Sequence, residues 1–435
     1  MSHKRQRMNP FRVLVLLLVI GAVIYADKYW VPNIPNPFVA TSTPTRPPES
    51  YITDAEQLVN EGRLTMAIAA YKQAIEVDPK NPSNYIALSK LYIYTGTYDE
   101  AIKNAEYAML LNPDNDQAMA LRGWAMGLAG DYINGEGSLK DAIAANPQNA
   151  AAYAYLSELY VLMVQAGQGQ LETSQNAIDL SKKAMEMAPG TLETHRARGI
   201  VLEYTGNYED AITEFEAAIA INPNIAYLHL ALGRNYSAIQ EYSKAITEYT
   251  KANALNPKDS QPETLISKTY LINGDYTKAV QYAEAALQDD PTDPYLYGNL
   301  GLAYWRNGQY QAAADALRMA VQGGSTSGGD VVTGLPIASG YAGQYYYTFG
   351  LALAKIGQCN TALQIAQIVA TSLKDDEVAV YNAQEMINMC ALLSTQGATD
   401  VPTPTFGPYP LGATATPEQA NTEAVTPTPT ATPTP

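Results

Sequence analysis

Seven prolines recur at a nearly constant spacing along the middle of the chain. They are separated by 34, 34, 42, 34, 34 and 34 residues, and they are Pro79, Pro113, Pro147, Pro189, Pro223, Pro257 and Pro291. A period of this length is typical of a solenoid, in which each unit cannot bury its own apolar face and must stack on its neighbours. The spacing therefore predicts one elongated stack of repeated units, an architecture that binds other molecules.

Each proline closes a segment with a common pattern. Segments 62–79, 97–113, 207–223 and 241–257 carry a small alanine every few residues and then a polar turn that ends in proline. Small side chains let two helices approach closely, and proline cannot continue a helix. This pattern resembles the second helix of a tetratricopeptide repeat (TPR).

The first helix of the repeat also recurs. With the closing proline counted as position 32, position 8 is small in eight successive units: Ala55, Ser89, Gly123, Ser157, Gly199, Gly233, Ser267 and Gly301. A ninth unit lacks the proline, and it follows a Gly-rich and Ser-rich insertion, residues 323–340, that we expect to be a surface loop. The resemblance covers residues 48–372 and implies an all-α TPR solenoid, a right-handed superhelix of about nine helix pairs.

The amino terminus predicts export. Four basic residues, Lys4, Arg5, Arg7 and Arg12, precede an apolar run over residues 13–26. Such a segment is a cleaved signal or a membrane anchor. Because Ile24 stands where a cleavage site needs a small side chain, we expect an uncleaved signal anchor or transmembrane helix over residues 13–30. Residues 1–12 would then stay in the cytoplasm, which predicts a single-pass protein of the cytoplasmic membrane with most of the chain extracytoplasmic.

Both ends of the repeat region have distinct compositions. Residues 31–47 form a stalk rich in proline and threonine, and residues 395–435 form a Thr/Pro-rich tail that we expect to be disordered. The tail resembles those of bacterial exported proteins; it is predicted to be an O-glycosylated stalk or a segment crossing a cell-wall layer. Between repeats and tail, residues 373–394 predict an amphipathic helix that caps the solenoid with a solvated face.

Charge and motifs exclude several function classes. The formal net charge of −16 makes nucleic acid a poor partner, because a phosphate backbone attracts positive charge. His195 and His229 both occupy position 4 of successive repeats, where an aromatic side chain packs, and no further metal ligand accompanies them. No catalytic nucleophile can be paired with a general base in this sequence, and no phosphate-binding loop is present. We therefore predict no enzyme and no cofactor.

The resemblance also implies a binding surface. In TPR proteins, positions 2, 5, 9 and 12 of the first helices line a concave face. The candidates at these positions are Trp124, Arg196, Glu203, Tyr227, Arg234, Lys268, Tyr295, Trp305 and Tyr347. Arg196, Arg234 and Lys268 would form a ladder of cations beside aromatic rings, which suits an extended acidic peptide. In the alternative, these cations pair with Glu203 and its neighbours and are structural.

Two functions follow from this surface. The first is a non-enzymatic scaffold that mediates protein–protein interaction at the outer face of the cytoplasmic membrane. The alternative is an accessory subunit for export or assembly of a cell-surface polymer, in which Trp124 and Trp305 would stack on sugars. The lysine and asparagine that bind chaperone tails in this family are absent from the matching places, such as Ile52 and Glu56. The partner's identity and the oligomeric state stay open.

The chain has two cysteines, Cys359 and Cys390. If the helices that carry them form a hairpin turning near Lys374, the cysteines lie 15 residues before the turn and 16 after it, and so face each other. In an oxidising compartment this predicts a disulfide that ties down the cap helix. Two buried free thiols are the alternative, because facing helices must also bring the Cα atoms within about 7 Å.

Overall fold

The computed structural model describes residues 10–29 and 46–395, and it divides the chain into two compact units, Met1–Ser50 and Tyr51–Pro435. The first unit contains helix α1 (Pro10–Tyr29). Within the described residues, no helix has both the length and the apolar character needed to cross a bilayer, so the transmembrane helix predicted over residues 13–30 is not found. Most of the predicted cytoplasmic segment, stalk and tail lies outside the described residues.

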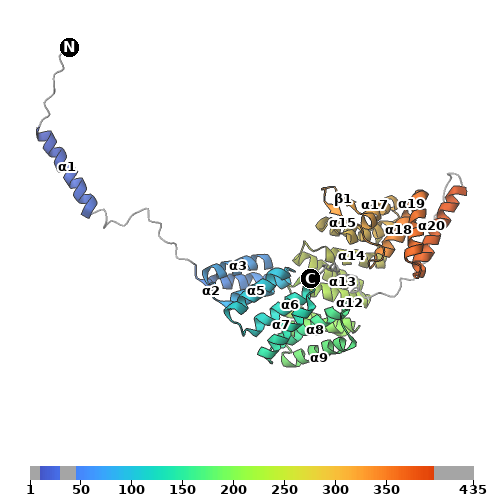
Figure 1. Ribbon diagram of the computed structural model, residues 1–435, viewed down its shortest axis with the longest axis horizontal. Coiled ribbons are helices and arrows are strands. Elements are labelled where there is room, and N and C mark those ends of the chain that lie inside the picture. Colours follow the sequence, from blue (N-terminus) through green and yellow to red (C-terminus); the bar gives the residue numbers. More distant parts are fainter. Residues whose placement is uncertain (1–9, 30–45, 396–435) are drawn as a thin grey trace, which may run out of the picture. The chain divides into compact units, whose positions relative to one another are not determined.

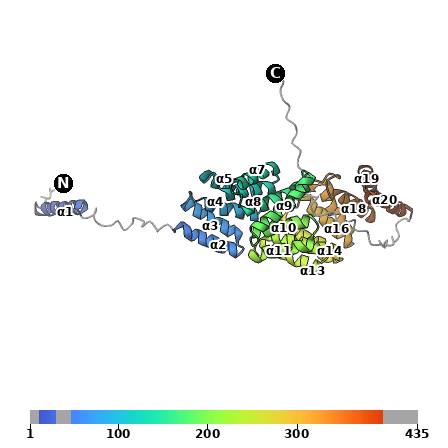
Figure 2. The same cartoon turned by 90° about the horizontal axis from the view of Figure 1, so that it is seen from below.

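The second unit is a succession of helix pairs (Figures 1 and 2). Within residues 46–395 there are nine pairs and one further helix, which confirms the predicted all-α solenoid and its cap helix. In chain order the helices are α2 (Pro48–Asn60), α3 (Leu64–Val77), α4 (Pro82–Tyr94), α5 (Tyr98–Leu111), α6 (Asp116–Leu128), α7 (Tyr132–Ala145), α8 (Ala150–Gln165), α9 (Leu171–Met187), α10 (Leu192–Tyr204), α11 (Tyr208–Ile221), α12 (Ala226–Ala238), α13 (Tyr242–Leu255), α14 (Ser260–Asn273), α15 (Tyr276–Asp289), α16 (Pro294–Arg306), α17 (Tyr310–Gln322), α18 (Ala342–Lys355), α19 (Cys359–Ser372) and α20 (Glu377–Thr395).

Small residues allow the two helices of each pair to touch. A Cβ atom on Gly123 of α6 would lie 2.7 Å from the carbonyl oxygen of Gly135 on α7. At the same position of a later repeat, a Cβ on Gly233 would lie 2.5 Å from the ring of Tyr249. Backbone and ring atoms cannot yield that much space, so position 8 has to be small. The repeat pattern in the sequence is therefore a packing pattern.

The turns between repeats are fixed by side chains that cap the next helix. Asn81, Asn115, Asn149, Asp259 and Asp293 each accept a hydrogen bond from a backbone N–H in the first turn of the helix that follows. These bonds satisfy donors that have no partner inside the helix. Because the caps recur at the same place, successive first helices start in the same orientation.

The first helices of successive repeats pack on one another along one side of the stack, which we call the inner face. Contacts join α4 to α6, α6 to α8, α8 to α10 and α10 to α12, and they resume from α14 to α16 and α18. One continuous apolar core extends from Ala55 to Leu232, and a second extends from Ala313 to Cys390. Side chains at corresponding positions of neighbouring first helices therefore share the inner face.

The insertion after α17 is not simply a surface loop. It contains two short antiparallel strands, β1 (Gly324–Ser325) and β2 (Val331–Val332). Its chain then packs against the solenoid, because Val332 and Leu335 are buried and Tyr346 donates hydrogen bonds to the carbonyl oxygens of Val321 and Leu335. The burial of these apolar side chains anchors the segment. The many glycines and serines of the insertion do not indicate this packing.

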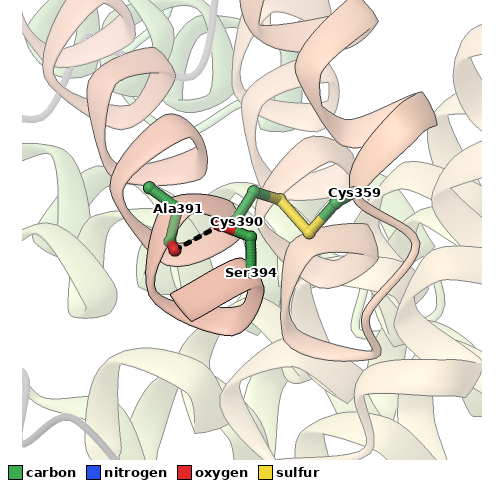
Figure 3. Close-up of a disulfide and its surroundings, with 4 residues drawn as sticks. All are labelled: Cys359, Cys390, Ala391 and Ser394. Atoms are coloured by element: carbon green, nitrogen blue, oxygen red, sulfur yellow. Dashed lines mark hydrogen bonds between the residues drawn. A yellow bond between two sulfur atoms is a disulfide. The ribbon is translucent and has the colours of Figure 1, made fainter. Parts of the chain in front are cut away.

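Helix α20 caps the stack by packing on α18 and α19. Its inner side buries Ala379, Ala383, Met386 and Cys390. Its outer side faces solvent, as predicted, and exposes polar residues such as Gln384 and Asn388. The same side also exposes apolar residues, namely Val378, Val380, Tyr381, Ile387 and Leu392. At the start of α19, Cys359 is joined to Cys390 by a disulfide, with the two Cα atoms 5.4 Å apart (Figure 3).

Candidate functional site

The candidate site is the inner face, and the structure divides its predicted residues into two groups. Trp124, Arg196, Glu203, Tyr227 and Arg234 belong to one network between α6 and α12. Lys268, Tyr295, Trp305 and Tyr347 lie on α14, α16 and α18 and are at least partly exposed. In the first group Trp124 and Arg196 are buried, whereas Tyr227, Glu203 and Arg234 are at least partly exposed.

A buried ion pair lies at the centre of the first group. Arg196 donates from Nε to Glu158 Oε1 at 2.7 Å, and its Nη2 contacts Glu158 Oε2. Trp124 Nε1 also donates to Glu158 Oε2, at 2.8 Å. Arg196 is 5% exposed and Glu158 2% exposed. Burial alone would lower the pKa of Arg196, but the charge and hydrogen bonds of Glu158 outweigh it and raise that pKa. At Glu158 burial is the larger effect and raises the pKa, although the charge of Arg196 and the hydrogen bonds from Arg196 and Trp124 lower it.

Aromatic rings enclose this pair. The Arg196 guanidinium lies 4.0 Å from the centroid of the Trp124 ring, and Trp124 stacks on Tyr155 with ring centroids 4.2 Å apart. Trp124 is only 2% exposed. A ring covered on both faces cannot stack on a ligand. The prediction that Trp124 stacks on sugars is therefore wrong for this conformation.

A second ion pair follows along the inner face. Arg234 donates to both carboxylate oxygens of Glu203, at 2.8 Å from Nε and 3.1 Å from Nη2. The ring of Tyr227 lies between the two arginines, with its centroid 5.5 Å from Arg196 and 5.7 Å from Arg234. Although Tyr227 is 37% exposed, the surrounding protein desolvates its hydroxyl and raises the pKa to about 12. The paired geometry favours the structural alternative for Arg196 and Arg234.

The first repeats also touch the fifth across the inner face. The ammonium of Lys90 on α4 donates to Glu193 Oε1 on α10, which lies 103 residues later. Asn224 Nδ2, in the turn before α12, donates to the backbone oxygen of Asn60 at 2.7 Å. These bonds connect repeats that are far apart in the chain. Hydrogen bonds between the protein's own residues therefore cross the inner face between α4 and α12.

Lys268 on α14 has different surroundings. It is exposed, and its ammonium lies 5.7 Å from the centroid of the Tyr341 ring. In the part of the chain that the structure describes, no carboxylate oxygen lies within 4.0 Å of its nitrogen. Neighbouring protein desolvates the ammonium and lowers its pKa, an effect that Asp293 opposes only in part. An incoming carboxylate would favour the charged form and complete this site.

Aromatic side chains continue the inner face beyond Lys268. Tyr295 on α16 meets Tyr345 edge to face with centroids 6.5 Å apart, and Trp305 lies 5.1 Å from Tyr310. Tyr295, Trp305 and Tyr347 are each partly exposed while packing on the second apolar core. Rigid rings of this kind offer contact area at a low cost in conformational entropy.

Some residues of the site were missed by the sequence interpretation. The positional rule that selected Arg234 and Lys268 also places Lys90 and Glu158 on this face, at position 9, but they were not chosen as site candidates. Glu193 occupies position 2 in the same way. Tyr341 lies directly after the insertion, before the first repeat position of the ninth unit, and no signal in the sequence points to it. The two histidines contact carboxylates, His195 with Glu214 and His229 with Glu248.

Comparison with known proteins gives consistent matches. Models described as tetratricopeptide repeat or TPR repeat match residues 55–96, 82–115, 192–225, 226–259 and 265–328. A tetratricopeptide repeat and J domain-containing co-chaperone of Cryptococcus neoformans is 25% identical over 220 residues, which are 49% of this chain and 40% of that protein. Human tetratricopeptide repeat protein 28 is 26% identical over 39% of this chain and 7% of its own length.

The chain thus spans less than half the length of these two relatives. Among solved structures, a tetratricopeptide repeat protein from Parabacteroides merdae is similar with a TM-score of 0.37 and 19% identity, covering 59% of this chain and 98% of that one.

Proposed function

We propose that this tetratricopeptide repeat protein is a non-enzymatic scaffold, and that the inner face from α14 to α18 binds an extended acidic segment of another protein. The observation that carries the proposal is Lys268, an exposed cation that faces Tyr341 and whose pKa neighbouring protein lowers by desolvation, with Asp293 opposing that effect. TPR proteins mediate protein–protein interaction, and some relatives are co-chaperones by name.

The acidic character of the partner follows from charge. Lys90, Arg196 and Arg234 already have carboxylate partners, so their charges are neutralised within the chain. Lys268 keeps a positive charge in a protein whose net charge is −16. A carboxylate placed on it would gain a charge-assisted hydrogen bond and relieve the desolvation of the ammonium. Tyr295 and Trp305 would contact the apolar parts of the same segment.

This binding surface on α14 to α18 is tested with Lys268→Glu and two sets of synthetic twelve-residue peptides. The first set is acidic and aromatic, and the second has lysine in place of each acidic residue. We expect the acidic peptides to bind the unaltered protein, and Lys268→Glu to weaken this binding at least tenfold, because attraction becomes repulsion. Fluorescence anisotropy measures both affinities.

The matched control is Lys278→Glu, which changes the same charge at an exposed lysine of α15 that pairs with Asp275. It should leave peptide affinity within about twofold, because exposed pairs contribute little. Equal losses in the two variants, or equal binding of acidic and lysine peptides, would contradict the proposal.

We further propose that the repeats act outside the cytoplasm, at the outer face of the cytoplasmic membrane. The support lies in the basic residues that precede the apolar run at residues 13–26, and in the pairing of Cys359 with Cys390. Disulfides persist in oxidising compartments and are rare in the cytoplasm. The amino-terminal segment would keep the protein at the membrane while the repeats remain free to bind.

Reporter fusions after Pro435 test this location. We expect a phosphatase that needs disulfides to be active there and a fluorescent protein that folds only in the cytoplasm to be dark, because the basic residues hold the amino terminus inside. Deleting residues 1–30 should reverse both results. A bright cytoplasmic reporter on the full chain would contradict export.

A further inference from the structure

His229 makes two hydrogen bonds that require two protons. It is 4% exposed, and its Nδ1 lies 2.7 Å from Glu248 Oε2 on α13. Its Nε2 lies 2.9 Å from the backbone oxygen of Pro223, in the turn before α12. A carbonyl and a carboxylate both accept hydrogen bonds, and a neutral imidazole has only one N–H to donate. Only the imidazolium form satisfies both partners.

The neighbouring carboxylate is ionised. Burial would raise the pKa of Glu248, but hydrogen bonds from His229 and Lys251 outweigh it and lower that pKa. Glu248 therefore stays an acceptor between pH 5 and 8, the range in which histidine changes charge. The imidazole of His229 is therefore the group at this site whose two hydrogen bonds depend on its own protonation.

The turn that His229 contacts, Pro223–Asn224, also contacts the first repeat. Asn224 follows Pro223, and its Nδ2 donates to the backbone oxygen of Asn60 at 2.7 Å. Gly62 lies against the same side chain, because a Cβ placed on it would be 3.0 Å from Asn224 Cγ. We call this contact, formed by Asn60, Gly62 and Asn224, the seam. A hollow of about 280 Å³ beside it is lined by Arg63, Tyr94 and Leu255 among others.

We propose that His229 is a pH-sensitive latch on the seam: its imidazolium fixes the Pro223–Asn224 turn against the first repeat, and loss of a proton releases that turn. After deprotonation one ring nitrogen presents a lone pair to an acceptor, so one of the two bonds is lost. The turn can then move, and Asn224 loses its fixed position over Asn60. Opening the seam would expose the part of the inner face between α4 and α12, including the Lys90–Glu193 pair.

Other charged groups near this site do not supply the same response. On α13, Lys251 pairs with Oε1 of Glu248, the oxygen that His229 does not contact. On α11, Glu214 pairs with His195 and Glu216 accepts from Tyr236. On the first repeat, hydrogen bonds from Gln57 and Arg63 lower the pKa of Glu61, which therefore stays ionised. His195 is one repeat away, and among the described residues its ring is hydrogen-bonded through Nδ1 alone, to Glu214.

The sign of the effect follows from the protonated form. The seam is closed when the imidazolium makes both bonds, at low pH, and it opens at higher pH once the imidazole has lost a proton. Since a single proton is linked, the ratio of closed to open molecules changes by at most about tenfold per pH unit. This regulation does not depend on what binds near Lys268.

The latch is tested on the full chain by spin labels attached to cysteines introduced at Glu56 on α2 and at Lys258 before α14, both exposed. We expect one short, narrow distance distribution at pH 5.5 and a second, longer population at pH 8. In His229→Gln the longer population should be present at both pH values. Asn224→Ala, which removes the seam bond and leaves the imidazole in place, should do the same.

His195→Gln is the matched control, because it removes the equivalent histidine one repeat earlier and leaves the seam bonds intact. It should keep the pH response of the unaltered protein. An identical distance distribution at pH 5.5 and pH 8 in the unaltered protein overturns the proposal without any variant. A full pH response in His229→Gln, with helical content preserved by circular dichroism, overturns it as well.

Discussion

Replacing Glu158 with alanine should lower the free energy of unfolding by about 3 to 5 kcal/mol, because it leaves a buried arginine without its counter-charge. Arg196 is 5% exposed, and its hydrogen bonds to Glu158 connect α10 with α8. The same change removes the acceptor of the Trp124 indole N–H. Urea denaturation followed by tryptophan fluorescence measures the loss.

Two further variants separate buried charge from general damage. Combining Glu158→Leu with Arg196→Met removes both charges and should recover most of the lost stability, since an apolar pair of similar volume replaces a buried ion pair well. Removing the exposed pair of Lys103 and Glu100, by Glu100→Ala, should change stability by less than about 1 kcal/mol. A loss below about 1 kcal/mol in Glu158→Ala would show that Arg196 reaches solvent or another partner.

Removing the disulfide should have the second largest effect. The bond between Cys359 and Cys390 closes a separation of 31 residues, for which the loop-entropy model gives a loss of about 3 to 4 kcal/mol. We expect this loss in the Cys359→Ser, Cys390→Ser double variant. Because the bond ties α20 to the start of α19 (Figure 3), hydrogen exchange should rise first in α20.

Mass spectrometry of the non-reduced protein, purified from the exported fraction, provides the decisive check. No thiol should react with an alkylating reagent under denaturing conditions before reduction, and two should react afterwards. Two reactive thiols before reduction would contradict both the disulfide and its role as support for export. Reductant added to the unaltered protein should lower its free energy of unfolding to that of the double variant. The same reductant should leave the free energy of unfolding of the double variant unchanged.

The candidate site was only partly predictable. Position within the repeat selected Arg234 and Lys268 as inner-face candidates, because helical periodicity decides which side of a helix a residue occupies. The same rule treated Arg196 and Lys268 alike, yet one is buried in an ion pair and the other is exposed. Burial depends on which other repeats approach that face, and periodicity within one repeat carries no information about them.

The sequence by itself determined the local architecture. Prolines at a fixed spacing, small residues such as Gly123 and Gly233, and recurring capping residues specify helix pairs, because each acts on atoms only a few residues or one helix away. The position of the two cysteines on a helical hairpin follows from the same short-range geometry. Tyr381 and Leu392 are apolar residues on the outer side of α20. Their exposure depends on which side of α20 packs against α18 and α19, and the sequence alone does not specify that side.

Only the tertiary structure decided how far the solenoid closes. The Lys90–Glu193 bond joins residues 103 positions apart, and the bond from Asn224 to Asn60 spans 164 positions. Whether such residues meet depends on the small rotation between neighbouring repeats, summed over several of them. A slight change in that rotation, with the same helices, would separate Lys90 from Glu193 and open the inner face. The repeat pattern defines the unit, whereas the accumulated rotation determines which part of the inner face remains accessible.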